Sequence, residues 1–316
     1  MGFSLKKILK TILPLILGVV LVWYSLSEIS IDILMGYFKK ANYSWVFLGL
    51  FFGVLSHLSR AYRWKFMLEP LGFKPKLANS ILAVLVGYLV NLALPRAGEV
   101  SRAFVLTNYE DIPFEKGFGT IVAERIADLI MMLCIIIITL FVQFDFIYEL
   151  VTKNFNPTKI SIGLAFLMIG SSILFSFVKK AKSGLLLKIK TFVTGLVEGV
   201  TSIFKMKRKQ AFIFHTLFIW TMYIAMFWAT IPAIEGLDVP LGGILIGFIA
   251  GGFSIAATNG GIGLYPIAVA GALALFDVPT EPATAFGWIM WTAQTAMIIT
   301  FGGLAFLFLP IYNKNP

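Results

Sequence analysis

Apolar stretches long enough to cross a bilayer recur along the whole chain. The strongest cover residues 11–27, 43–59, 119–143, 160–178, 211–232 and 285–310, and two weaker stretches, 79–95 and 242–276, contain Gly and Pro interruptions. A spanning helix needs about 20 apolar residues, and no polar block is long enough to form a separate domain. The pattern therefore predicts an all-α polytopic membrane protein with a single domain, residues 1–316.

The positions of Lys and Arg predict the orientation of these stretches. Lys6, Lys7 and Lys10 place the amino terminus in the cytoplasm, and nine basic residues between Lys179 and Lys209 place that segment there too. Residues 79–118 then begin and end on the cytoplasmic side, and residues 242–276 begin and end outside, beside Glu235 and Asp277, so each must enter the membrane and return on the same side. Both termini are cytoplasmic in this topology. The sequence thus predicts about six spans and two re-entrant hairpins.

The two halves of the chain, approximately residues 5–145 and 155–312, then share one plan in opposite orientations. Each has two spans, a hairpin and a further span. Such inverted repeats are typical of secondary transporters, in which broken helices meet near a substrate site. The alternative is that both interrupted stretches cross the membrane, which would give eight full spans.

Charged residues inside the predicted first hairpin are the strongest candidates for a site. Its turn contains Arg96, Glu99 and Arg102 between two apolar arms. Charges at membrane depth are costly, so they are usually paired and functional, and two Arg residues near a helix start suit a phosphate. The alternative is a shallow cytoplasmic loop that touches lipid headgroups.

Three further groups of residues accompany this hairpin. Glu124, Arg125 and Asp128 open the span 119–143. Near the midplane they would pair with Arg96 or Arg102, gate a pathway or relay protons, and the alternative is a purely structural salt bridge between helices. The second hairpin turns through a neutral segment whose backbone is suited to close approach by a ligand: Asn259, Gly260, Gly261 and Gly263. A basic aromatic group follows the second span, where interfacial anchoring is the default and headgroup capture the alternative: Arg60, Arg63 and Trp64.

Composition narrows the class of function. Only 13% of the residues are charged, and the net charge of +10 comes from blocks beside apolar stretches, which topology explains better than nucleic-acid binding. The chain has one cysteine, and no motif for a metal, nucleotide or other cofactor is found. We therefore expect neither a cofactor nor a metal site.

Four motifs occur in order: R-x-x-R-W at 60–64, P-R-A-G-E-x-x-R at 95–102, E-R-x-x-D at 124–128 and G-G-I-G at 260–263. Together they resemble the transmembrane region of bacterial lysyl-phosphatidylglycerol synthases, whose stand-alone relatives are flippase-like or UPF0104-type proteins. The resemblance covers residues 5–310 and implies movement of an aminoacylated phospholipid between leaflets of the bacterial cytoplasmic membrane. It also implies that the charged residues of the first hairpin and of 124–128 form the polar site.

The leading hypothesis is therefore a flippase or lipid-like transporter for a phospholipid or a lipid-linked headgroup, and not an enzyme. One alternative is a membrane partner or regulator of a separately encoded lipid-modifying transferase. Another is an enzyme that transfers a group to a lipid with Glu99 or Glu124 as base, against which the missing donor site argues. The expected partners are membrane phospholipid, such a transferase and a second copy of the chain.

Overall fold

The computed structural model describes residues 18–27, 29–94, 96–154 and 206–314, with isolated positions between 155 and 205. Every regular element in this described part is a helix, which confirms the predicted all-α class. Residues 1–124 and 210–316 form one compact unit, and residues 125–209 form another. The single domain and the inverted halves 5–145 and 155–312 stay predictions.

Four helical segments of the described part are long and apolar enough to cross a membrane. They are α3 (Tyr43–Leu68) continued by η1 (Glu69–Leu71), α6 (Phe114–Val142), α10 (Lys209–Thr230) continued by η2 (Ile231–Ala233), and α13 (Thr280–Tyr312). They correspond to the predicted spans 43–59, 119–143, 211–232 and 285–310. The predicted span 160–178 and most of 11–27 lie outside the described residues.

The chain turns sharply after its first described helix. Gly18–Ser27 and α2 (Ile31–Lys40) meet at 85°. Ser30 caps α2 by accepting a 3.3 Å hydrogen bond from the Ile33 amide, and the helix ends on Lys39 and Lys40, which suit the negative end of its dipole. This short helix was not predicted, because its apolar residues are too few and too scattered to form a span.

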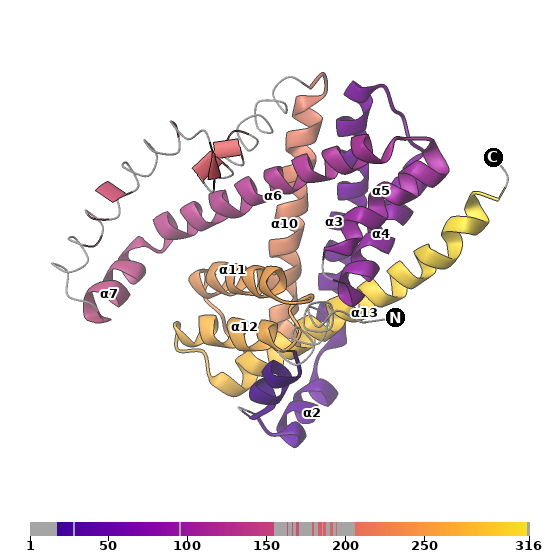
Figure 1. The fold of residues 1–316 in the computed structure, drawn as a ribbon. Coiled ribbons are helices and arrows are strands. Elements are labelled where there is room, and N and C mark those ends of the chain that lie inside the picture. Colours follow the sequence, from indigo (N-terminus) through magenta and orange to yellow (C-terminus); the bar gives the residue numbers. More distant parts are fainter. Residues whose placement is uncertain are drawn as a thin grey trace, which may run out of the picture. The chain divides into compact units, whose positions relative to one another are not determined.

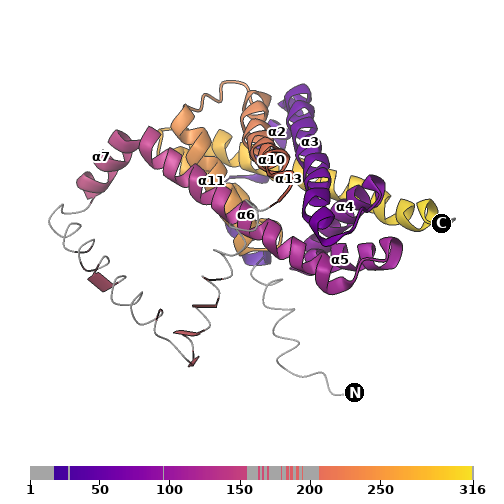
Figure 2. The same cartoon turned by 90° about the horizontal axis from the view of Figure 1, so that it is seen from above.

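The first predicted hairpin is present as α4 (Leu77–Ala93) and α5 (Ala97–Glu110), which lie side by side next to α3 (Figures 1 and 2). Glycine permits the close approach of the two arms, because a Cβ on Gly98 would lie only 2.0 Å from the carbonyl oxygen of Gly87. Asn91 Oδ1 accepts a 2.7 Å hydrogen bond from the Gly98 amide. A side chain of α4 thus satisfies a free amide at the start of α5.

The second hairpin consists of α11 (Leu241–Ala257) and α12 (Leu264–Ala274). At ~1.5 Å per residue, the 11 residues of α12 extend about 16 Å, roughly half of a 30 Å hydrocarbon core. Helix α12 is therefore too short to cross by itself. The re-entrant course of the two hairpins stays a prediction, with eight full spans as its alternative.

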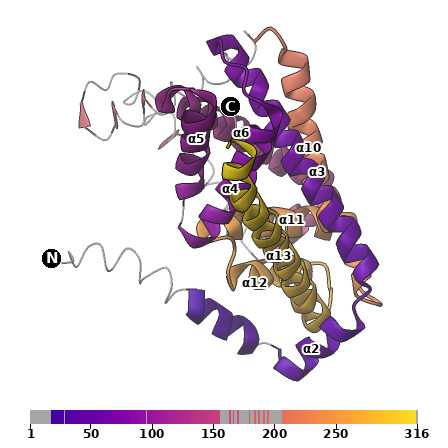
Figure 3. The same cartoon turned by 90° about the vertical axis from the view of Figure 1, so that its right-hand side faces the viewer.

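Helix α13 runs past both hairpins and packs on α4 of the first and α12 of the second (Figure 3). Glycine again permits close contact, since a Cβ on Gly302 would lie 2.7 Å from Leu89 Cβ and one on Gly287 would lie 2.7 Å from Pro266 Cα. Helices α3 and α10 lie side by side and antiparallel (Figures 1 and 3). These contacts hold both hairpins in one unit with α3 and α10.

The remaining described helix, α7 (Phe144–Asn154), follows α6 in the second unit. The segment 179–209, predicted to be cytoplasmic, belongs to the same unit but falls mostly outside the described residues.

Candidate functional site

A buried carboxylate, that of Glu124 on α6, binds three guanidinium groups. Arg60 Nη1 donates a hydrogen bond to Glu124 Oε1. Arg102 donates two, from Nη1 to Oε1 at 3.2 Å and from Nη2 to Oε2 at 3.0 Å. Arg63 Nη2 lies 3.6 Å from Oε1. We call Arg60, Arg63, Arg102 and Glu124 the arginine cluster.

The fold assembles this cluster from three helices. Arg60 and Arg63 are three residues apart on α3, so they share one helical face. Arg102 comes from the returning arm of the first hairpin and crosses Gly87, where a Cβ would lie 2.7 Å from Arg102 Cγ. The hairpin is therefore what brings Arg102 to the carboxylate on α6.

Aromatic and hydroxyl side chains surround the guanidinium groups. The Arg102 guanidinium lies over the Trp64 ring, 4.3 Å from its centre, and Trp64 Nε1 donates a 2.8 Å hydrogen bond to Thr120 Oγ1. Arg63 Nη1 donates to Thr216 Oγ1 at 2.9 Å. Such cation–π and charge-assisted contacts are strong where water is excluded. They fix the direction of each Arg side chain.

A line of polar side chains leads away from the cluster. Arg60 Nη2 donates to the Tyr223 hydroxyl at 3.4 Å, and this hydroxyl lies 3.3 Å from that of Tyr88. The Tyr88 ring packs on the His57 ring with centres 4.4 Å apart. The line therefore connects α3, α10 and α4.

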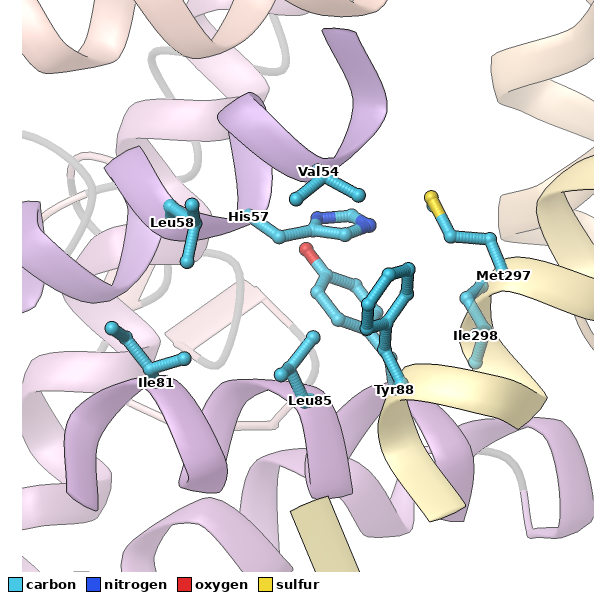
Figure 4. Close-up of a pocket in the computed structure, with 9 residues that line it drawn as sticks. Val54, His57, Leu58, Ile81, Leu85, Tyr88, Met297 and Ile298 are labelled. Carbon is cyan, nitrogen blue, oxygen red and sulfur yellow. The ribbon is translucent and has the colours of Figure 1, made fainter. Parts of the chain in front are cut away.

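His57 and Tyr88 also form part of the wall of an apolar pocket of about 130 Å³ between α3, α4 and α13 (Figure 4). The rest of the wall is aliphatic, Phe or Met side chain, including Leu85 and Ile298. In Figure 4 the imidazole lies between Val54 and Tyr88. An apolar space thus adjoins one end of the polar line.

The structure brings together only some of the residues predicted from the sequence. Arg102 and Glu124 are paired, which is one of the two pairings left open above. Arg96 is exposed, with a left-handed φ of 61° at the start of α5. Glu99 is half-buried and accepts a 3.5 Å hydrogen bond from Asn91 Nδ2. Within this hairpin it is Arg102 that bonds the Glu124 carboxylate.

Arg125 and Asp128 belong to the second unit and form a pair three residues apart on α6, with 3.6 Å between Arg125 Nη1 and Asp128 Oδ2. The Arg125 side chain is 43% exposed. This ion pair lies within one helix, whereas Glu124 joins α6 to α3 and α5.

Arg60, Arg63 and Trp64 are not interfacial anchors, in contrast to the default expectation. Their relative exposures are 3%, 0% and 0%. The reason is Glu124, a buried carboxylate that needs nearby positive charge. The spacing of Arg60 and Arg63 on one face of an otherwise apolar helix was the available signal. Thr120, Thr216 and Tyr223 were missed, because single hydroxyls in apolar helices give no pattern.

The glycine-rich turn of the second hairpin contacts the protein's own chain. The Gly260 carbonyl accepts a 2.8 Å hydrogen bond from Trp291 Nε1. A Cβ on Gly260 would lie 2.9 Å from Leu92 Cδ2, near the end of α4, so the tips of the two hairpins are adjacent. A Cβ on Gly263 would lie 2.5 Å from the Val22 amide nitrogen. Asn259, Gly261 and these two glycines thus form a separate contact region, outside the arginine cluster.

Long apolar helices, two short hairpins and a buried ion cluster together define a polytopic α-helical membrane protein. Residues 11–303 match the family described as the lysylphosphatidylglycerol synthase TM region. The chain belongs to this family, as the motif pattern predicted.

Two relatives share shorter segments with the chain. The UPF0104 membrane protein MJ1595 of Methanocaldococcus jannaschii is 30% identical over 125 residues, which are 39% of this chain and 37% of the relative. Glycosyltransferase AglD of Haloferax volcanii is 33% identical over 78 residues, which are 24% of this chain and 12% of the relative. The matches therefore cover well under two thirds of either relative. No solved structure matches the chain.

Proposed function

We propose that the protein moves a phospholipid or a lipid-linked headgroup between the leaflets of the membrane, as a transporter and not as an enzyme. The observation that carries this proposal is the convergence of Arg60, Arg63 and Arg102 on the buried carboxylate of Glu124. Charged groups inside membrane helices are rare and mark substrate pathways. Stability alone is a weak reason to bury four of them, because desolvation offsets much of their attraction.

The chemistry of the cluster fits the phosphate of a lipid headgroup. Three positive charges face one negative charge, and adding Asp128, one turn further along α6, still leaves an excess of one positive charge. Arg102 binds Glu124 through two parallel hydrogen bonds, which is the geometry in which Arg also binds phosphate. A phosphate would compete with Glu124 for Arg102, so binding and release are linked to a change in this ion pair.

The hairpins provide a way for the cluster to open. Arg102 stands on α5, a helix of 14 residues that reaches only ~21 Å and is tied to its neighbours by the α4 arm. All four residues of the cluster lie in the first predicted half, whereas Tyr223 and Thr216, which bond Arg60 and Arg63, lie on α10 in the second half. Rocking of the two predicted inverted halves would separate the cluster from α10 and expose the guanidinium groups alternately. In this arrangement both termini lie at the cytoplasmic side, which reporter fusions to residue 316 would test.

The experiment is leaflet exchange of headgroup-labelled phospholipids in liposomes that contain the purified protein, with anionic, zwitterionic and aminoacylated lipids compared. We expect one class to exchange in the wild type and to lose exchange in Arg102→Ala, whereas Arg208→Ala, an exposed Arg outside the cluster, retains it. Gel filtration and thermal unfolding show that each variant is folded. Equal exchange by folded Arg102→Ala and wild type would refute the proposal.

The match to a protein named a glycosyltransferase favours a second candidate function. The chain would then serve as the membrane partner or regulator of a separately encoded lipid-modifying transferase. Co-purification of a transferase with the tagged protein, combined with absent lipid exchange by the protein alone, would favour this role.

A further inference from the structure

We propose that the pocket between α3, α4 and α13 holds one fatty acyl chain of a membrane phospholipid beside the arginine cluster. The inference rests on the proposed function, which identifies the ligand as a lipid. It adds a second part to the substrate site, one that recognises the hydrocarbon and not the headgroup.

The size and lining of the pocket suit hydrocarbon. Its volume is about 130 Å³, and apart from His57 and Tyr88 its wall is made of aliphatic, Phe and Met side chains. An apolar cavity of roughly 150 Å³ stays dry and takes up an apolar molecule. A section of an acyl chain therefore suits this space better than water, which would find few hydrogen-bond partners there.

Access to the pocket is through the sides of membrane-spanning helices. Two of its wall residues, Leu58 on α3 and Phe301 on α13, are 39% and 42% exposed. Both helices are long and apolar enough to cross a membrane, so apolar side chains exposed on them face lipid tails. A chain can therefore enter sideways from the bilayer without passing through water.

The pocket adjoins the arginine cluster along α3 and through the tyrosine line. His57 precedes Arg60 by three residues on α3, a rise of ~4.5 Å. Tyr88 in the pocket wall is joined to Arg60 through Tyr223. A single phospholipid could thus place an acyl chain in the pocket while its phosphate approaches the guanidinium groups.

His57 also supplies a hydrogen-bonding group at the polar edge of the pocket. The side chain is 9% exposed, and its Nδ1 atom is buried without a hydrogen-bond partner in the part of the chain that the structure describes. A buried polar atom of this kind is unfavourable until a partner is bound. The ester carbonyl at the head of an acyl chain is an acceptor for an imidazole N–H at this place.

Photolabelling from within the membrane tests the proposal without measuring transport. The full chain is placed in liposomes containing a phospholipid with a diazirine on one acyl chain, irradiated, digested and analysed by mass spectrometry. We expect label at Leu85 of the wild type. Ile298→Trp fills the pocket and should lower labelling at Leu85 to the level of the lipid-facing Leu307, because the acyl chain no longer fits.

The matched control is Ile299→Trp, the same substitution at the neighbouring position, which is 54% exposed and not part of the pocket wall. It should leave labelling at Leu85 unchanged. Ile298→Ala, which enlarges the pocket, should retain the label and covers the case in which Ile298→Trp does not fold.

Equal labelling of Leu85 in Ile298→Trp and Ile299→Trp would overturn the acyl-chain site. So would labelling of Leu85 in the wild type that is no stronger than labelling of the lipid-facing Leu307, which is 62% exposed. The two proposals can fail separately. Specific labelling without leaflet exchange would sustain the acyl-chain site and refute transport by this chain, and exchange without specific labelling would do the reverse.

Discussion

Replacing Glu124 with Gln is the most direct test of the arginine cluster. The substitution preserves the shape of the side chain and removes the charge that Arg60, Arg63 and Arg102 share. One amide oxygen can still accept, but the amide nitrogen now places its own N–H groups toward guanidinium donors. The result is three buried positive charges without their common counter-charge.

The expected loss in the free energy of unfolding is about 3–5 kcal/mol, the range found when one partner of a buried ion pair is removed. Glu124 is 0% exposed and Arg102 is 3% exposed, so water cannot restore the lost hydrogen bonds. Exposed charge substitutions rarely exceed about 0.5 kcal/mol. Glu235→Gln, in an exposed turn, is therefore the matched control.

The assay is reversible unfolding in mixed micelles, followed by the fluorescence of the tryptophans, of which Trp64 lies against Arg102. A double-mutant cycle with Arg102→Met isolates the coupling between the two side chains, expected at roughly 0.5–3 kcal/mol. A loss below about 0.5 kcal/mol for Glu124→Gln, or no coupling to Arg102, would show that the carboxylate does not organise the cluster.

Three further substitutions test other contacts, two by the same unfolding assay and one, Arg102→Lys, by lipid exchange. Gly98→Ala puts a methyl group 2.0 Å from a backbone oxygen and should destabilise the first hairpin by ~1–3 kcal/mol. The control is Gly271→Ala, whose methyl group meets open space, and it should change stability by less than about 1 kcal/mol. Similar losses for both variants would refute the close approach of α4 and α5. Arg102→Lys keeps the charge but cannot make the bidentate pair of hydrogen bonds that a guanidinium group makes. Lipid exchange should therefore fall while folding is retained. Exchange at the wild-type rate would contradict a need for bidentate binding. Trp288→Phe removes the 3.0 Å hydrogen bond to Ser25 and should cost about 1 kcal/mol; an unchanged unfolding curve would speak against that contact.

The positions of the long helices could be predicted from the sequence because hydropathy reflects the solvent around each helix. The Pro-Arg-Ala-Gly sequence at 95–98 and the glycines from Gly260 also predicted the turns between α4 and α5 and between α11 and α12, since Pro and Gly interrupt regular helix in an apolar setting. Helix α2 escaped prediction because it has only 10 residues, far fewer than a span needs. A short interfacial helix has no length signal comparable to that of a span.

The site was only partly predictable, and Arg60 shows why. Basic residues near the end of an apolar helix usually lie among lipid headgroups, and nothing local distinguishes them from basic residues that turn inward. The deciding fact is the long-range approach of Glu124, 64 residues later in the chain. Arg102 was easier to assign, because a charge between two apolar arms has few alternatives to pairing inside the protein.

The contact between the first described helix and the last span has a consequence for biosynthesis. Ser25 bonds Trp288, 263 residues later, and Val22 lies against the turn at Gly263. At a synthesis rate of ~5–20 residues per second, the amino-terminal helix must wait about 13–50 s for these partners. During that interval lipid or the insertion machinery has to occupy its docking face. The amino-terminal helix is thus among the first segments to be synthesised and among the last to pack against its partners.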